Sequence, residues 1–157
     1  MAFDKNQFKD LIERTLKEIR VSSPAAVSLL LGTAAKESHF GTYLKQIDGP
    51  ALGVFMMEPS TETDIWVNVL NGAKDLKNRI INATGQIGPN VRALHTNISY
   101  QICMCRAHYL RFPEPFPNGN NVRALGEYWK KYYNTAAGKG TIEDFIACWE
   151  RFIGGRP

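Results

Sequence analysis

The chain has 157 residues, of which 44% are hydrophobic and 22% charged, and this balance excludes a disordered tail. The length matches one ordinary domain with a substantial buried core, so we expect a single domain over residues 1–157. The formal net charge of +4 is small and spread along the chain, which favours an anionic partner without indicating nucleic acid.

The sequence pattern predicts neither membrane insertion nor an export signal. No stretch approaches the roughly 20 apolar residues that a membrane-spanning helix needs. The best apolar run, Ala25–Leu31, is interrupted by Ser28. Residues 1–10 include several charged side chains and lack the apolar block of a secretory signal. We therefore expect synthesis in the cytoplasm, with another route of delivery to any site of action outside it.

The chain contains three cysteines, Cys103, Cys105 and Cys148, which cannot all pair with one another. No Cys-x-x-Cys or His-x-x-x-His spacing is present, so we expect no bound metal. Small, weakly polar thiols are common in protein cores, and reduced, packed cysteines are the favoured interpretation.

The first part of the chain predicts two helices followed by a loop. Phe3–Ile19 has apolar residues three or four positions apart, which is typical of an amphipathic helix. Ser23 and Pro24 together favour a helix start. From there an apolar helix is expected to run towards Glu37, with Gly41 as its stop. Residues 41–59 are rich in glycine and proline and predict a loop, with space for a short hairpin.

The second part predicts further helices. One is expected to start at Pro59 and end near Gly72, a short one covers 73–83, and residues 85–90 predict a turn. The remaining helices are expected over 97–110, 121–133 and 142–152. Thr141 and Asp144 form a capping box for the last of them. Six or seven helices around one core make the expected fold all-α, with at most a very small β hairpin.

Glu37 is the residue whose position first suggests chemistry. It lies near the C-terminal end of the long apolar helix, where the negative end of the helix dipole raises the pKa of a carboxyl group. Phe40 is expected to desolvate it further. A carboxyl group that stays protonated near neutral pH suits a general acid for glycosidic bonds. The alternative is a solvated residue that pairs with Lys36.

Three segments in order along the chain carry a family resemblance. Glu37-Ser38 is followed by Gly53-Val-Phe-Met-Met-Glu-Pro-Ser-Thr61, and Tyr133-Asn134-Thr-Ala-Ala-Gly138 comes later. This order resembles the signature of the lytic transglycosylases. In that family a Glu-Ser pair closes a helix, a Gly-Leu-Met-Gln-x-Met-Pro-x-Thr-like segment follows a loop, and a Tyr-Asn-x-Gly-like element comes later. The short length and the lack of an export signal resemble the phage-encoded members of this lysozyme-like group.

The resemblance implies a lysozyme-like domain whose active-site cleft binds bacterial peptidoglycan. It implies a cleavage of the β-1,4 bond between N-acetylmuramic acid and N-acetylglucosamine with a 1,6-anhydro product and no cofactor. Glu37 would act as acid and then as base. We therefore expect a monomer that acts on the bacterial cell wall. It would be carried in a phage particle or released as a lysin.

The resemblance also assigns substrate-binding roles to residues around Glu37. Ser38 would orient the glutamate or the substrate, and Tyr133 and Asn134 would place a hydroxyl and an amide group over the sugar. Met56 departs from the family pattern, because it falls near the position where a glutamine is usual, and a core gap-filler is its other interpretation. Helix packing is the alternative role for Tyr133.

Two carboxylates and one histidine leave other mechanisms open. Glu58 and Asp48 are candidates for a second carboxylate, which would make hydrolysis possible, although Glu58 before Pro59 also suits a helix start. His39 lacks a triad pattern and is at most a substrate contact. A hydrolytic muramidase with Glu37 as acid and an inactive wall-binding or structural virion protein are therefore the two alternatives.

Overall fold

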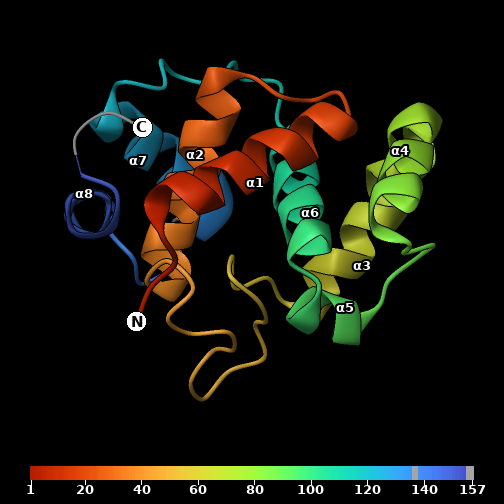
Figure 1. Cartoon of the computed structure of the whole chain (residues 1–157), viewed down its shortest axis with the longest axis horizontal. Coiled ribbons are helices and arrows are strands. Elements are labelled where there is room, and N and C mark those ends of the chain that lie inside the picture. Colours follow the sequence, from red (N-terminus) through yellow and green to blue (C-terminus); the bar gives the residue numbers. More distant parts are fainter. Residues whose placement is uncertain (136–137, 155–157) are drawn as a thin grey trace.

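The computed structural model describes residues 1–135 and 138–154, and within them the chain forms eight α-helices (Figure 1). The β structure of this part of the chain is limited to two isolated antiparallel bridges, which join Leu52 to Lys45 and to Met57. Asp48, Gly53 and Met56 all have positive φ angles, so the backbone curls between the bridges and cannot extend into strands. The all-α prediction is confirmed, and the hairpin is reduced to these bridges.

The elements are joined by turns and loops of different lengths, and the longest of these joins α2 to α3 over residues 39–58. The helices are α1 (Lys5–Glu18), α2 (Pro24–Ser38), α3 (Pro59–Asn68), α4 (Lys74–Thr84), α5 (Val91–Thr96), α6 (Ile98–Leu110), α7 (Val122–Trp129) and α8 (Ile142–Phe152). A 3₁₀ turn, η1 (Leu70–Gly72), follows α3, and a π-helical turn, η2 (Lys130–Asn134), follows α7.

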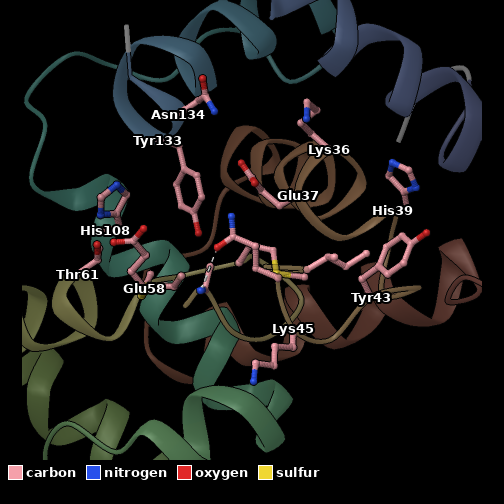
Figure 2. A pocket seen from close by; sticks show the side chains of 15 residues that line it. Lys36, Glu37, His39, Tyr43, Lys45, Glu58, Thr61, His108, Tyr133 and Asn134 are labelled. Atoms are coloured by element: carbon pink, nitrogen blue, oxygen red, sulfur yellow. Dashed lines mark hydrogen bonds between the residues drawn. The ribbon is translucent and has the colours of Figure 1, made fainter. Parts of the chain in front are cut away.

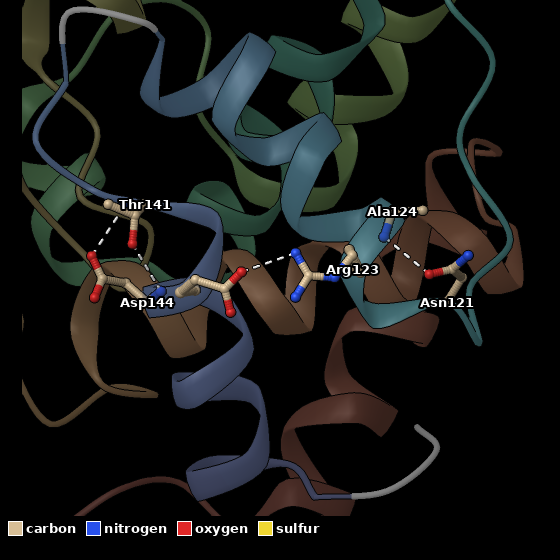
Figure 3. A network of polar contacts seen from close by, with 6 residues as sticks. Asn121, Arg123, Ala124, Thr141 and Asp144 are labelled. Carbon is tan, nitrogen blue, oxygen red and sulfur yellow. Dashed lines mark hydrogen bonds and ion pairs between the residues drawn. The ribbon is translucent and has the colours of Figure 1, made fainter.

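Side-chain caps start two helices where the sequence predicts them. The Ser23 hydroxyl accepts a hydrogen bond from the backbone N–H of Ala26, and Pro24 is the first residue of α2. At α8 the Thr141 hydroxyl accepts from the Asp144 N–H while the Asp144 carboxylate accepts from the Thr141 N–H (Figure 3). The predicted capping box is therefore confirmed.

The predicted boundaries differ from the structure in several regions. Helix α2 ends at Ser38, with His39 as its left-handed C-cap, before the predicted stop at Gly41. Helix α3 ends at Asn68, and the rest of the helix predicted to end near Gly72 is the 3₁₀ turn η1.

Helix α5 is absent from the prediction, because its cap, Asn90, ends a segment that predicts a turn; the side-chain carbonyl oxygen of Asn90 accepts from the Ala93 N–H. The helix expected over 121–133 is α-helical only as far as Trp129 and continues as the π turn. Apolar spacing does not distinguish an α turn from a π turn, so this change is not predictable from the sequence.

Two helices that are buried on all sides organise the core. In α2 the apolar side chains point in every direction, and Leu29, Leu30 and Leu31 are fully buried. Helix α2 packs against α1, α6, α7 and α8. Helix α6 is buried from Tyr100 to Ala107 and lies between α1 and the group of α3, α4 and α5 (Figure 1). The end of α2 and the loop 41–58 come together at one end of this core.

Candidate active site

A cavity of about 470 Å³ lies where the end of α2, the loop 41–58, α6 and η2 meet (Figure 2). All of the predicted site residues except Ser38 and the candidate carboxylate Asp48 line it, although they come from three segments that are far apart in the sequence. The cavity wall is formed by Lys36, Glu37, His39, Tyr43, Lys45, Gln46, Ile47, Ala51, Met56, Met57, Glu58, Thr61, His108, Tyr133 and Asn134.

Glu37 lies in the last turn of α2 and is partly buried in the cavity wall. The indole N–H of Trp129 donates a hydrogen bond to its Oε1 atom at 3.2 Å. Burial raises the pKa of Glu37 to about 7 from its ordinary value of 4.5, and the Lys36 ammonium and the Trp129 hydrogen bond oppose this rise. Glu37 is therefore close to half-protonated at neutral pH, which suits a group that both donates and accepts a proton.

The aromatic group beside Glu37 is Trp129, not the expected Phe40. Phe40 is fully buried and packs between the rings of Phe8 and Phe152. Its φ angle of 57° turns the chain away from α2 immediately after the turn that bears Glu37. Proximity in sequence suggests Phe40, whereas Trp129 reaches Glu37 from a helix 92 positions further along the chain.

Tyr133 lies beside Glu37, and its ring separates Glu37 from Glu58 and His108 in the view of Figure 2. Its hydroxyl group donates to the backbone carbonyl of Phe55 at 2.6 Å and so connects η2 with the loop 41–58. Burial raises the pKa of Tyr133 well above its usual value, and the neighbouring Cys105 and Glu37 act in the same direction. The phenol therefore stays neutral and can donate a hydrogen bond.

Met56 and Glu58 belong to the turn that Tyr133 holds in place. Met56 has a φ angle of 46°, and its N–H donates to the carbonyl of Gly53. Its side chain lines the cavity, so it is not a core gap-filler alone. Glu58 is the N-cap residue of α3, but its side chain makes no capping hydrogen bond, and this exposed residue lines the cavity.

Asn134 lines the cavity at the end of η2. Its side-chain carbonyl accepts a hydrogen bond from the Lys130 ammonium at 2.7 Å, and the same ammonium donates to the backbone carbonyl of Gly138. The Lys130 contacts thus join the two ends of the Tyr-Asn-to-Gly segment. The Ala136 and Ala137 positions of that segment lie outside the described residues.

Ser38 does not belong to the cavity wall. It is fully buried, and its hydroxyl donates to the Ala34 carbonyl and accepts from the Gly41 N–H. Both bonds close the end of α2 on the following turn. Ser38 thus fixes the helix end that carries Glu37, which agrees with the expected role of orienting the glutamate, and its side chain does not line the cavity in which a substrate would bind. Asp48 also lies outside the wall, whereas His39 lines it.

His108 lines the cavity and is missing from the sequence prediction. Its ring packs edge-on against Tyr133, with the ring centres 5.0 Å apart, and Nε2 lies 3.3 Å from the Tyr132 carbonyl. Burial lowers the pKa of His108 to about 4, aided by the Arg111 cation. The imidazole is thus neutral at physiological pH. The sequence around His108 does not predict that this residue lines the cavity, because its position depends on the packing of η2 against α6 in the fold.

No described group of three or more histidine, cysteine, aspartate and glutamate side chains is arranged to hold a metal ion. Cys103 and Cys105 are buried free thiols on α6, and Cys148 is a partly buried free thiol on α8. Burial raises the pKa of Cys103 to about 12, so it is an unreactive packing group.

The cavity wall combines a carboxyl group of raised pKa with a neutral phenol, an amide and a neutral imidazole.

Among the described residues, no helix combines the length and the apolar character that crossing a bilayer requires. Comparisons with known proteins give no relative: no family model, no curated protein and no solved structure matches this chain.

Proposed function

We propose that this chain is a peptidoglycan lytic transglycosylase with Glu37 as its general acid and base. The observation that carries the proposal is the carboxyl group of Glu37, whose pKa of about 7 coincides with its place in the wall of a cavity of about 470 Å³. The resemblance to the lytic transglycosylases suggests that peptidoglycan is the substrate and that the β-1,4 bond between its two sugars is the bond cleaved. Met56, Glu58, Tyr133 and Asn134 lie in the same wall.

The proposed reaction needs one carboxyl group. Protonated Glu37 gives its proton to the bridging oxygen, the bond from that oxygen to the anomeric carbon of N-acetylmuramic acid breaks, and N-acetylglucosamine leaves with a free 4-hydroxyl. The substrate's own N-acetyl oxygen stabilises the cationic carbon. The muramoyl 6-hydroxyl then attacks this carbon while ionised Glu37 takes its proton. Atoms balance without water, and Glu37 returns to its starting state.

The neighbouring groups suit the handling of a neutral sugar. The Asn134 amide and the Thr61 hydroxyl provide uncharged hydrogen-bonding groups along one side of Glu37. Tyr43 provides an aromatic face on the other side (Figure 2). Groups that can contact a sugar therefore lie on both sides of Glu37.

Release of soluble fragments from dye-labelled bacterial sacculi tests the proposal. We expect release by the wild-type chain and a loss of at least about a thousandfold for Glu37→Gln, because proton transfer is lost in both half-reactions. The variant Glu58→Gln is the comparison, since it makes the same chemical change in the same cavity wall, and we expect it to lose far less activity. Equal release by the wild type and Glu37→Gln would contradict the proposal.

A hydrolytic muramidase is the second candidate, and the position of Glu58 favours it. Glu58 is an exposed residue in the same cavity wall as Glu37, and its side chain has no capping role. In that reaction Glu58 would assist a water molecule that attacks the anomeric carbon. Loss of activity in Glu58→Gln as complete as in Glu37→Gln would favour the muramidase over the transglycosylase.

A further inference from the structure

Trp129 is the side chain that donates a hydrogen bond to Glu37, and it is fully buried as the last residue of α7. The bond goes to one carboxyl oxygen, Oε1, at 3.2 Å. An indole N–H can only donate a hydrogen bond. It therefore stabilises a carboxyl oxygen that bears no proton. The other oxygen of Glu37 is thereby the one left to carry the proton.

The indole ring is held from several directions. Phe145 of α8 packs against it with ring centres 5.5 Å apart, and the Lys36 ammonium lies 5.6 Å from the ring centre. Gly140 approaches its edge so closely that an added Cβ atom would lie 2.7 Å from the Cη2 atom of Trp129. The N–H therefore has little freedom to move away from Glu37.

The two helices that carry this arrangement are joined to each other. Helices α7 and α8 pack together, and Arg123 of α7 pairs with Glu143 of α8 at 2.9 Å (Figure 3). The capping box at Thr141 fixes the start of α8 just after Gly140. The exposed ion pair contributes little free energy. The buried contact of Phe145 with Trp129 joins α8 directly to the residue that contacts Glu37.

We propose that Trp129 is the positioning residue of Glu37: its clamped indole N–H holds one carboxyl oxygen and directs the other to the cavity. This inference rests on the proposed function for its catalytic consequence, but the hydrogen bond and its effect on Glu37 are independent of the substrate. Trp129 is absent from the cavity wall and acts through Glu37 alone.

The other groups near Glu37 do not replace this donor. The titratable neighbours that interact with it electrostatically come from four elements: Lys36 of α2, Cys105 and Tyr109 of α6, Tyr133 of η2 and Cys148 of α8. The thiols and phenols have raised pKa values and are neutral near pH 7. The Tyr133 hydroxyl is already engaged with Phe55.

Trp129→Phe tests the inference, because it removes the N–H and retains an aromatic ring. With the carboxyl carbons of glutamate labelled for NMR, we expect Glu37 to titrate at higher pH than in the wild type, since a bond to the ionised form is lost. On sacculi we expect kcat to fall about tenfold with KM nearly unchanged, because the hydrogen bond positions the acid without touching the substrate.

Trp66→Phe is the matched control. Trp66 is also buried, and its indole N–H donates to the Tyr100 hydroxyl at 2.8 Å in another part of the core. We expect it to lose stability while the Glu37 titration stays as in the wild type. Gly140→Ala is the second variant, which keeps the N–H but displaces the ring; it should move the Glu37 titration in the same direction as Trp129→Phe.

An unchanged Glu37 titration in folded Trp129→Phe would overturn the inference, and so would an unchanged titration in Gly140→Ala if Trp129→Phe does not fold. Failure of the positioning role can be distinguished from failure of the transglycosylase proposal, because the NMR titration of Glu37 does not depend on enzymatic activity. If Glu37 shifts in the variants while the wild type releases nothing from sacculi, the positioning role stands and the transglycosylase proposal fails.

Discussion

At the scale of single residues, Glu37 gains its chemical character at the expense of stability. A carboxyl group with a raised pKa binds a proton more tightly in the folded chain than in the unfolded one. Between pH 4.5 and about 7 the folded state therefore holds more protons, and this group's contribution to stability falls as the pH rises through that window. Above pH 7 the raised pKa of Glu37 lowers the free energy of unfolding by about 3 kcal/mol relative to its value below pH 4.5.

Glu37→Gln should therefore be more stable than the wild type at pH 8, by up to about 3 kcal/mol, and nearly equal to it at pH 4. Urea unfolding at the two pH values measures the difference. Other titrating groups are common to both proteins and cancel in the comparison. A glutamine variant that is less stable than the wild type at pH 8 would show that Glu37 is not held in a destabilised ionised form.

Tyr133→Phe removes the hydroxyl that holds the Phe55 carbonyl. We expect a loss of about 1 kcal/mol in the free energy of unfolding and about a tenfold loss of activity, because the loop segment with Met56 loses one of the hydrogen bonds that hold it. Tyr128→Phe loses a similar bond, to the Glu114 carbonyl at 2.9 Å, outside the cavity. It should lose stability alone, and equal activity loss in both variants would contradict the assignment.

Residue patterns in the sequence indicate Glu37 but not its surroundings. Glu37 is recognisable because a carboxylate ends an otherwise apolar helix. Trp129 and His108 are not, because each belongs to the apolar pattern of its own helix, and only tertiary packing brings them to Glu37 and the cavity. The role of Ser38 comes from the resemblance, and its two internal hydrogen bonds are invisible in a sequence.

At the scale of elements, the loop 41–58 depends on a close approach of its backbone to α5 and α6. Gly53 has a φ angle of 79°, and an added Cβ atom would lie 2.6 Å from the Leu94 carbonyl. The next N–H, of Val54, donates to the Gln101 side chain at 2.8 Å. This contact sets the position of the turn that bears Met56 and Glu58.

Gly53→Ala should therefore lower the free energy of unfolding by about 2 kcal/mol and reduce activity, because both the φ angle and the contact resist a methyl group. Gly72→Ala is the control: a Cβ atom there meets nothing within 4 Å. Thermal unfolding and dye release from sacculi measure both effects. Equal behaviour of the two variants would mean that the loop is not anchored at Gly53.

Elements with strong local signals are predicted well. The caps at Ser23 and Thr141 mark helix starts with side-chain oxygens that accept from the next turn, and both are confirmed. Helix α5 is only six residues long and offers too few positions for a periodic pattern. In the π turn that follows α7, the Tyr133 ring packs against His108 of α6 and the Tyr132 carbonyl contacts the same imidazole, and local sequence does not indicate these contacts.

At the scale of the whole molecule, three segments that are distant in sequence form one cavity. The end of α2, the loop 41–58 and η2 approach one another because α2 and α6 are buried on all sides and fix the surrounding helices. Helical spacing in the sequence predicts the all-α class. The meeting of the three segments is expected from the family resemblance alone, since spacing within helices gives no information on their relative positions.

The mass of the products released from purified sacculi distinguishes the proposed reaction from its alternatives. We expect the wild-type chain to release muropeptides lighter by one water than their reducing-end forms, and Glu37→Gln to release none. Anhydro products from both proteins, at the same rate, would contradict the role of Glu37. Hydrated products that Glu37→Gln fails to release would contradict the transglycosylase and leave Glu37 as the acid of a muramidase.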